Sequence, residues 1–239
     1  MKYFKIVGAF LLRLLFPLRC PVCDEILRRP GEGICRECRG TFRPISKPWC
    51  LRCGKQLLQG GMYCRECAEG EHVFVRGRSL YQYDSCAEAI YRFKYGGRRE
   101  YGDYFGQEIA VGLGDFIRGV SPDALVPIPL HKKRFRKRGY NQAKALAVAV
   151  SRYTGVPVEN NLLVRVKNTR PLKQLNPKER QNNLKKAFKL TENDVKLKTI
   201  VLIDDIYTSG STVDEAARTL KAGGVKDVYV VTLAGGKAW

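Results

Sequence analysis

Apolar and polar positions in the second half of the chain alternate between strand and helix patterns. An apolar run at 199–203 precedes a polar loop and then helical spacing over 213–220. An earlier apolar run at 123–130 also precedes a polar stretch and helical spacing, over 143–150. This alternation predicts an α/β domain with a parallel sheet. The loops that follow parallel strands lie at one edge of such a sheet, so we expect the two polar stretches to meet there.

Two carboxylates and a hydroxyl-rich loop follow the run at 199–203. Asp204 and Asp205 come first, and Thr208-Ser-Gly-Ser-Thr212 comes after two spacers. Glycine and the start of a helix let backbone N–H groups converge on an anion, so this loop suits a phosphate monoester. The spacing from Thr212 to Glu215 is that of a capping box and predicts a helix start near Thr212. Carboxylates repel phosphate, so the acidic pair must face hydroxyls, such as a ribose diol, or a metal.

This ordered pattern resembles the 5-phosphoribosyl-1-pyrophosphate (PRPP) binding loop of type I phosphoribosyltransferases. The resemblance implies that Asp204 and Asp205 are catalytic residues that contact the ribose hydroxyls directly or through Mg²⁺. It assigns the 5-phosphate to the loop residues Thr208, Ser209, Gly210, Ser211 and Thr212. The alternative is an acidic dipeptide on an ordinary solvated loop.

A basic cluster lies in the other polar stretch. The chain carries a formal net charge of +20, which attracts nucleic acid, phosphorylated substrates or a membrane surface without choosing among them. Residues 126–142 resemble the pyrophosphate loop of type I enzymes and, more narrowly, the signature of the ComF competence family: Pro-x-Pro-Leu, a basic run, and Arg-Gly-aromatic-Asn-Gln. The residues assigned to pyrophosphate or its supports are Leu130, His131, Lys132, Arg134, Arg138, Asn141 and Gln142. His131 either contacts the anion or only holds the loop, and a solvated basic face is the alternative for the whole cluster.

Two further segments resemble parts of the ComF pattern. Residues 167–183 are polar, basic and interrupted by two prolines, and the resemblance implies a lid that excludes water from the reacting centre. A purely structural loop is the alternative. Arg170, Gln174 and Arg180 match the pattern there, and Arg170 joins the catalytic set. Lys94, among interleaved aromatic and cationic residues, is a candidate phosphate contact, with a solvated helix lysine as the alternative. Such interleaving suits single-stranded nucleic acid or an ordinary helix end.

Four C-x-x-C pairs mark the first part of the chain. Two such pairs supply the four thiolates of one tetrahedral zinc site, and the near-equal spacing of the pairs makes this interpretation strong. We predict two structural Zn²⁺ sites with sequential ligands, Cys20, Cys23, Cys35 and Cys38 on one ion and Cys50, Cys53, Cys64 and Cys67 on the other. Interleaved pairing and a disulfide framework are the alternatives. Cys86 is expected to be a small buried hydrophobe, and His72 an ordinary residue rather than a ligand.

The pattern divides the chain into three parts: an amphipathic helix at 1–18, a double zinc ribbon at 19–72, and a phosphoribosyltransferase-like domain at 73–239. The first segment is too short and too charged to span a membrane and offers no small-residue cleavage site. Together these parts follow the ComF order.

Family resemblance implies a type I phosphoribosyltransferase fold, a role in natural transformation, and a cytoplasmic location near the inner face of the membrane. It implies PRPP, single-stranded DNA and a DNA translocase or other competence proteins as partners. As an enzyme, the protein would use Mg²⁺ with PRPP and pass ribose 5-phosphate to an acceptor. The alternative function is a non-catalytic module that binds nucleic acid or a partner and senses PRPP or a nucleotide.

Overall fold

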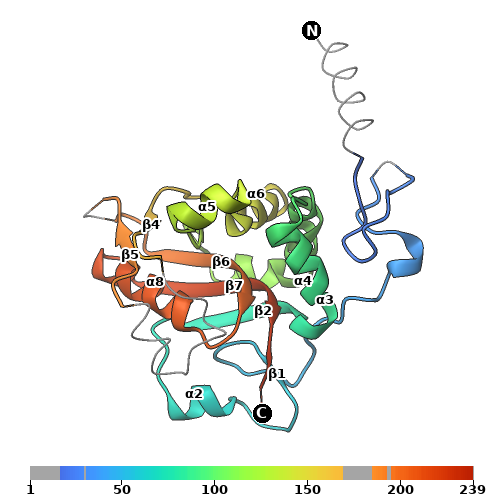
Figure 1. Cartoon of the computed structure of the whole chain (residues 1–239). Coiled ribbons are helices and arrows are strands. Elements are labelled where there is room, and N and C mark those ends of the chain that lie inside the picture. The colour runs from blue at the N-terminus through green and yellow to red at the C-terminus, as the bar shows by residue number, and fades with distance from the viewer. Residues whose placement is uncertain (1–16, 30, 169–184, 193–194, 239) are drawn as a thin grey trace.

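The computed structural model describes residues 17–29, 31–168, 185–192 and 195–238. Its centre is a four-stranded parallel sheet with the strand order β2-β7-β6-β3 (Figure 1). The strands are β2 (Arg76–Gln82), β3 (Ala124–Pro127), β6 (Thr199–Tyr207) and β7 (Asp227–Gly235). The predicted α/β class and parallel sheet are therefore confirmed, and β6 runs on through the acidic pair instead of ending before it.

Both faces of the sheet are covered. Val201 and Ile203 of β6 are fully buried against a core formed with α3 (Tyr83–Tyr95), α4 (Tyr101–Gly119) and α6 (Gln142–Thr154). The alternate residues Ile200 and Leu202 pack on the opposite face with α8 (Ser211–Ala222). Successive strand side chains point to opposite faces, so a strand buried on both sides is apolar at every position.

The second cysteine module, with Cys50, Cys53 and Cys64, packs on the face of the sheet that α8 covers. Figure 1 shows α2 (Arg65–Glu69) beneath the sheet, whereas residues 17–29 and 31–39 lie to one side of it, beyond α3. The strand β1 (Gln56–Leu57) pairs in parallel with β8 (Lys237–Ala238). The C-terminal end of the described chain is thereby connected to the second cysteine module.

Shorter elements complete the fold. The 3-10 helix η1 (Arg36–Cys38) carries the last cysteine of the first cluster. The strand β4 (Leu163–Arg165) pairs antiparallel with β5 (Phe188–Leu190). Cys86 in α3 is 1% exposed, as expected of a small buried hydrophobe.

The predicted capping box at Thr212 is wrong. The helix α8 begins at Ser211, its N-cap is Gly210 in the left-handed conformation (φ 77°), and no side chain caps it. Glu215, which would close the box, instead accepts a hydrogen bond from the backbone N–H of Lys186 at 2.6 Å and pairs with Arg218 at 2.6 Å. A tertiary contact has thus taken the carboxylate that the local pattern would have used.

The basic run at 131–138, predicted to be a loop, forms the short helix α5 (Lys132–Arg138). His131 is its N-cap and accepts a hydrogen bond from the backbone N–H of Lys133 through Nδ1 at 3.3 Å. Gly139 ends the helix with a φ of 77°. Lysine and arginine have high helix propensity, and two capping residues in the right places are enough to shape a turn of this length.

Several predictions fall on other residues. Residues 1–16 of the predicted amphipathic helix, and Arg170, Gln174 and Arg180 of the predicted lid, lie outside the described residues. Within the described part of the chain, no helix has the length and apolar character needed to cross a membrane.

Candidate functional site

A lysine from α3 forms an ion pair with the acidic pair near the end of β6. Asp205 is 7% exposed, and its Oδ1 lies 2.8 Å from Nζ of Lys94. The Lys94 side chain is itself only 16% exposed. The alternative of a solvated lysine is therefore wrong, and Lys94 compensates one of the two adjacent carboxylates.

Asp204 has a different electrostatic environment. Its Oδ1 accepts a hydrogen bond from the backbone N–H of Asp205 at 2.8 Å. Burial, followed by repulsion from the Asp205 charge, raises the pKa of Asp204 to about 7. Asp205 thus has the Lys94 ammonium as its direct partner, whereas Asp204 holds a proton more readily than an ordinary aspartate and releases it when a bound cation compensates its charge.

The hydroxyl-rich turn follows directly between β6 and α8. Gly210 has a backbone conformation that other residues rarely adopt, and Ser209 Oγ lies 2.9 Å from Ser211 Oγ across it. The first N–H groups of the 12-residue α8 lack helical partners and point toward the same turn. Of the five residues assigned to the 5-phosphate, Thr208, Ser209 and Gly210 lie in this turn, and Ser211 and Thr212 begin α8. Their binding roles remain predictions.

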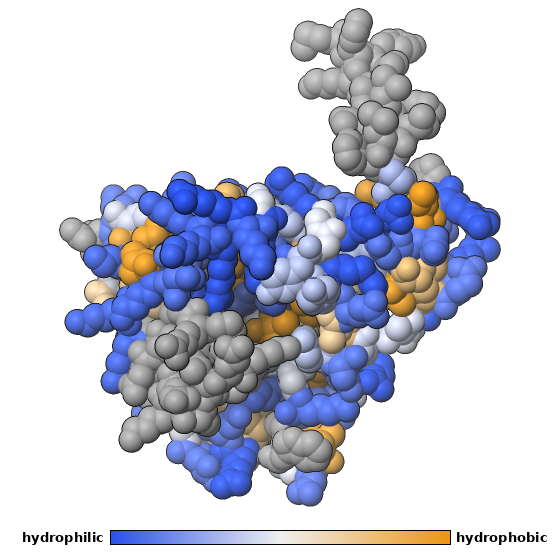
Figure 2. Space-filling model, viewed as in Figure 1, coloured by the Kyte–Doolittle hydropathy of each residue, from blue (hydrophilic) through white to orange (hydrophobic). Residues whose placement is uncertain are grey.

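The helix α5, which follows the edge strand β3, supplies positive charge. Arg134 and Arg138, one turn apart, are half-buried, whereas Lys132 and Lys137 are exposed. Burial, and then repulsion from Arg138, lowers the pKa of Arg134. Figure 2 shows hydrophilic side chains gathered over α5 on the upper part of this face. The basic run therefore has an inward side made of arginine and an outward side made largely of lysine.

Asn141 and Gln142 hold the α5 segment in place. Asn141 donates from Nδ2 to the Ile128 carbonyl at 3.0 Å and accepts from the Ala143 N–H at 3.0 Å, which caps α6. Gln142 is 1% exposed, and its Oε1 accepts from Arg138 Nη1 at 2.9 Å. Of the group assigned to pyrophosphate or its supports, these two residues are placed as supports, and His131 is placed as the cap of α5.

Arg165 was not identified from the sequence. It ends β4, is 9% exposed, and its guanidinium lies 5.4 Å from the ring centroid of Phe188. Burial, and then the charge of Arg134, lowers the pKa of Arg165 to about 10, and the nearby charge of Asp204 opposes this shift. Arg165 thus links the acidic pair to the inward arginines. The available sequence signal was an arginine within the otherwise apolar run at 162–166, just before the basic segment 167–183.

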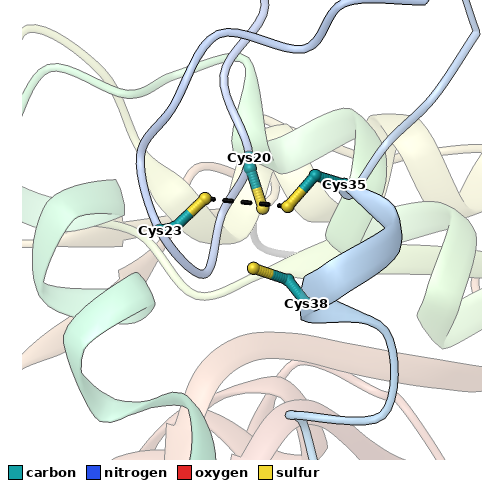
Figure 3. Close-up of side chains that lie close together, drawn as sticks. All are labelled: Cys20, Cys23, Cys35 and Cys38. Carbon is teal, nitrogen blue, oxygen red and sulfur yellow. Dashed lines mark hydrogen bonds between the residues drawn. The ribbon is translucent and has the colours of Figure 1, made fainter.

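The eight paired cysteines form two clusters of four. In each cluster, all ligand atoms lie within 4.8 Å of one another. The sulfur atoms of Cys23 and Cys35 are 3.7 Å apart (Figure 3), and so are those of Cys53 and Cys64. Zinc–sulfur bonds of about 2.3 Å give a tetrahedron with edges of about 3.8 Å, whereas a disulfide requires about 2.05 Å. The sequential zinc pairing is confirmed, and the interleaved and disulfide alternatives are wrong.

His72 is also more closely engaged than the sequence indicated. Its Nδ1 lies 2.7 Å from Asp214 Oδ2 in the first turn of α8, and its ring stacks on Phe74 at 4.7 Å. Its Nε2 lies 3.4 Å from the hydroxyl of Tyr207, the last residue of β6. His72 belongs to neither cysteine cluster, as expected, but it contacts the hydroxyl-rich turn from below.

Comparison with known proteins agrees with these two parts. A double zinc ribbon domain matches residues 11–68, and a phosphoribosyl transferase domain matches residues 133–238. Competence protein F of Haemophilus influenzae is 31% identical over 225 residues, which cover 92% of this chain and 97% of that protein. The chain belongs to the competence protein F family.

Other relatives support the same membership. Competence protein ComFC of Bacillus subtilis is 32% identical, over 85% of this chain and 88% of that protein. The DNA utilization protein YhgH of Escherichia coli is 28% identical, over 91% and 96% of the two chains. A solved structure of glutamine PRPP amidotransferase from B. subtilis, complexed with ADP and GMP, is a distant likeness with a TM-score of 0.34. It is 17% identical, over 58% of this chain and 26% of that one. The family is a competence-associated one with a phosphoribosyltransferase domain behind a double zinc ribbon.

Proposed function

We propose that this protein binds Mg²⁺ and PRPP between the β6–α8 turn and α5 and acts as a phosphoribosyltransferase. One observation carries the proposal: an acidic pair and a hydroxyl-rich turn at the N-terminus of α8 follow one another at the end of a single buried strand. The order supplies a site for a ribose diol next to a site for its 5-phosphate. Arg134, Arg138 and Arg165 supply positive charge for the pyrophosphate group.

Each group has a distinct role in this proposal. Asp204 and Asp205 bind the ribose hydroxyls and the Mg²⁺ that accompanies PRPP. Lys94 already brings a cation to Asp205, so this part of the site accommodates positive charge before substrate arrives. The residues at 208–212 hold the 5-phosphate through hydroxyl and N–H donors. Zinc is structural, since each closed set of four thiolates leaves no open coordination position.

The chemistry follows from this charge distribution. The bond from C1 of the ribose to pyrophosphate breaks and leaves positive character on the sugar, while an acceptor nucleophile forms the new bond at C1. Carboxylates near the sugar stabilise the first charge, and arginines stabilise the departing pyrophosphate. Arg170, in the predicted lid, would add to this charge and help to exclude water. Positioning and electrostatics supply the catalysis, and no covalent protein nucleophile is required.

The names of the relatives give the context. Two are competence proteins and one is a DNA utilization protein, and we propose a corresponding role in the handling of imported single-stranded DNA. The exposed lysines of α5 and the net charge of +20 suit a polyanion. We propose a cytoplasmic location near the inner face of the membrane, with a DNA translocase or other competence proteins as partners. DNA binding of this kind is expected to weaken steeply as salt concentration rises.

A screen for pyrophosphate release tests the proposal. The zinc-loaded protein is incubated with Mg²⁺ and PRPP in the presence of bases, nucleosides or DNA ends, and PRPP affinity is measured by calorimetry. We expect affinity in the wild type and its loss in the double variant Asp204→Asn, Asp205→Asn. Binding without release under any acceptor would favour the sensing alternative, and equal affinity in the double variant would refute the site.

A further inference from the structure

The second cysteine cluster shares a hydrophobic core with the turn that is proposed to bind the 5-phosphate. Cys50, Cys53 and Cys64 are at most 2% exposed and pack in the same core as Tyr207 of β6 and Val213 of α8. Lys55, 5% exposed, lies 5.7 Å from the Tyr207 ring centroid and pairs with Glu66 of α2. The second zinc ribbon therefore supports the underside of β6 and α8 in place of a further helix.

His72 connects this ribbon to the first turn of α8. Its side chain is 9% exposed and that of Asp214 is 15% exposed, so the 2.7 Å contact between them is largely shielded from water. The second oxygen of Asp214 accepts a hydrogen bond from the Val73 N–H at 2.8 Å. The Asp214 N–H donates to the Gly210 carbonyl at 2.8 Å. One carboxylate thus ties the chain leaving the zinc ribbon to the start of the helix.

Gly210 rests directly on two of these side chains. A Cβ atom built on Gly210 would lie 2.4 Å from the Tyr207 hydroxyl and 2.9 Å from Cε1 of His72. Both distances are far below van der Waals contact, so the turn follows the surface that His72 and Tyr207 present. The positions and directions of the N–H groups in the turn therefore depend on His72 and Tyr207, although neither residue is assigned to the 5-phosphate itself.

The first cysteine cluster makes different contacts. Arg92 of α3 donates to the Val22 carbonyl at 2.6 Å, Tyr101 of α4 donates to the Cys20 carbonyl at 3.1 Å, and Arg98 pairs with Asp24 at 2.7 Å. These contacts lie on the opposite face of the sheet from α8. The two clusters, alike in chemistry, therefore differ in their relation to the phosphate turn.

We propose that His72 and Tyr207 are positioning residues for the 5-phosphate turn, through which PRPP affinity depends on the second zinc site and not on the first. This inference rests on the proposed function of the turn. Misplacing N–H donors by a fraction of an ångström weakens their hydrogen bonds to an anion without unfolding the domain. PRPP affinity and global stability should therefore respond differently to changes at His72.

Calorimetric titration of the zinc-loaded full chain with Mg²⁺ and PRPP tests the role of His72. His72→Phe keeps the ring against Phe74 but removes the contact with Asp214, and we expect a loss of affinity of about tenfold or more. His72→Asn keeps an N–H donor near the Nδ1 position and should recover part of the loss. Ile117→Val on the opposite face is the matched stability control, and its affinity should stay within about twofold of wild type. Zinc content of two ions per chain is verified for each variant.

The outcomes separate this inference from the proposed function. If the wild type does not bind PRPP, both are overturned. If the wild type binds, the Asp204→Asn, Asp205→Asn variant does not, and His72→Phe binds like wild type, only the inference is overturned. Should His72→Phe fail to fold, Asp214→Asn tests the same contact from the helix side, with unchanged affinity again counting against it.

A second comparison addresses the two zinc sites. Cys67→Ser and Cys23→Ser each remove one ligand, and each variant is purified with one zinc ion per chain. We expect Cys67→Ser to lose PRPP affinity by about tenfold or more while Cys23→Ser stays within about twofold. Equal losses, or a larger loss for Cys23→Ser, would contradict the proposed dependence on the second site.

Discussion

Neighbouring aspartates with opposite effects on stability provide the sharpest test of the site. Asp204→Asn is expected to stabilise the unliganded protein at about pH 8, because it removes a carboxylate whose ionisation burial and Asp205 make unfavourable. The Asn side chain retains the oxygen that accepts from the Asp205 N–H. Asp205→Asn is expected to destabilise it, because Lys94, 16% exposed, loses its carboxylate partner.

The magnitude follows from the raised pKa of Asp204. A rise from 3.8 to about 7 is roughly three units, and at about 1.36 kcal/mol per unit it sets an upper bound of about 4 kcal/mol. Solvent screening of this partly exposed carboxyl reduces the expected gain to on the order of 2 kcal/mol. Loss of the Asp205 carboxylate should cost a similar amount in Asp205→Asn, since Lys94 loses its 2.8 Å partner and keeps only its attraction to the charge of Asp204.

The pH dependence has a defined sign. The native-state pKa of Asp204 lies above its unfolded value, so the native state binds more protons between about pH 4 and pH 7. Its contribution to the free energy of unfolding therefore falls as the pH rises through this window and is lowest above it. The advantage of Asp204→Asn should be present at about pH 8 and absent near pH 4, where the wild-type carboxyl is already protonated.

Urea denaturation of the zinc-loaded protein at several pH values measures these effects. Wild type, Asp204→Asn and Asp205→Asn are compared at equal zinc content, and the slope with urea checks that the transition is unchanged. A destabilised Asp204→Asn at pH 8, or an advantage that does not change with pH, would refute the electrostatic account. PRPP affinity should fall in both variants, which separates the stability of the site from its function.

Three further predictions concern other parts of the molecule. Gly210→Ala places a methyl group against Tyr207 in a left-handed backbone, and we expect lost PRPP affinity by calorimetry and about 1–2 kcal/mol of destabilisation. Asp24→Asn should weaken the attachment of the first zinc ribbon, and faster proteolysis before residue 40 would detect this. Burial raises the pKa of Asp24, but hydrogen bonds from Arg98 and Tyr101 outweigh burial and lower the pKa. The stabilisation that Asp24 provides is therefore lost as the pH falls below about 4. Arg138→Gln should weaken pyrophosphate binding by about tenfold in a competition assay, whereas the neighbouring exposed Lys137→Gln should have little effect.

The short-range pattern of the chain indicated the chemistry that we propose for this protein. The order of apolar run, acidic pair, hydroxyls and glycine predicted a strand, a turn and a helix, because strand and helix periods and the backbone freedom of Gly210 depend on neighbouring residues. The near-equal spacing of the cysteine pairs predicted two sets of four thiolates, and the clusters confirm the sequential grouping. Local patterns also misled: the carboxylate of Glu215 was assigned to a cap, and residues 131–138 to a loop.

Only the tertiary structure decided which charges and supports belong to the site. Lys94 reaches Asp205, and Arg165 lies near Asp204, through the packing of α3 and β4 against β6. His72 and Asp214 are 142 positions apart in the sequence, yet they meet beneath the phosphate turn. Burial and ion pairing depend on which elements fold together, and a sequence period carries no such information about distant partners. The sequence therefore indicated the ligand that we propose for the site, whereas the fold determined how its charges are compensated and what holds its turn in place.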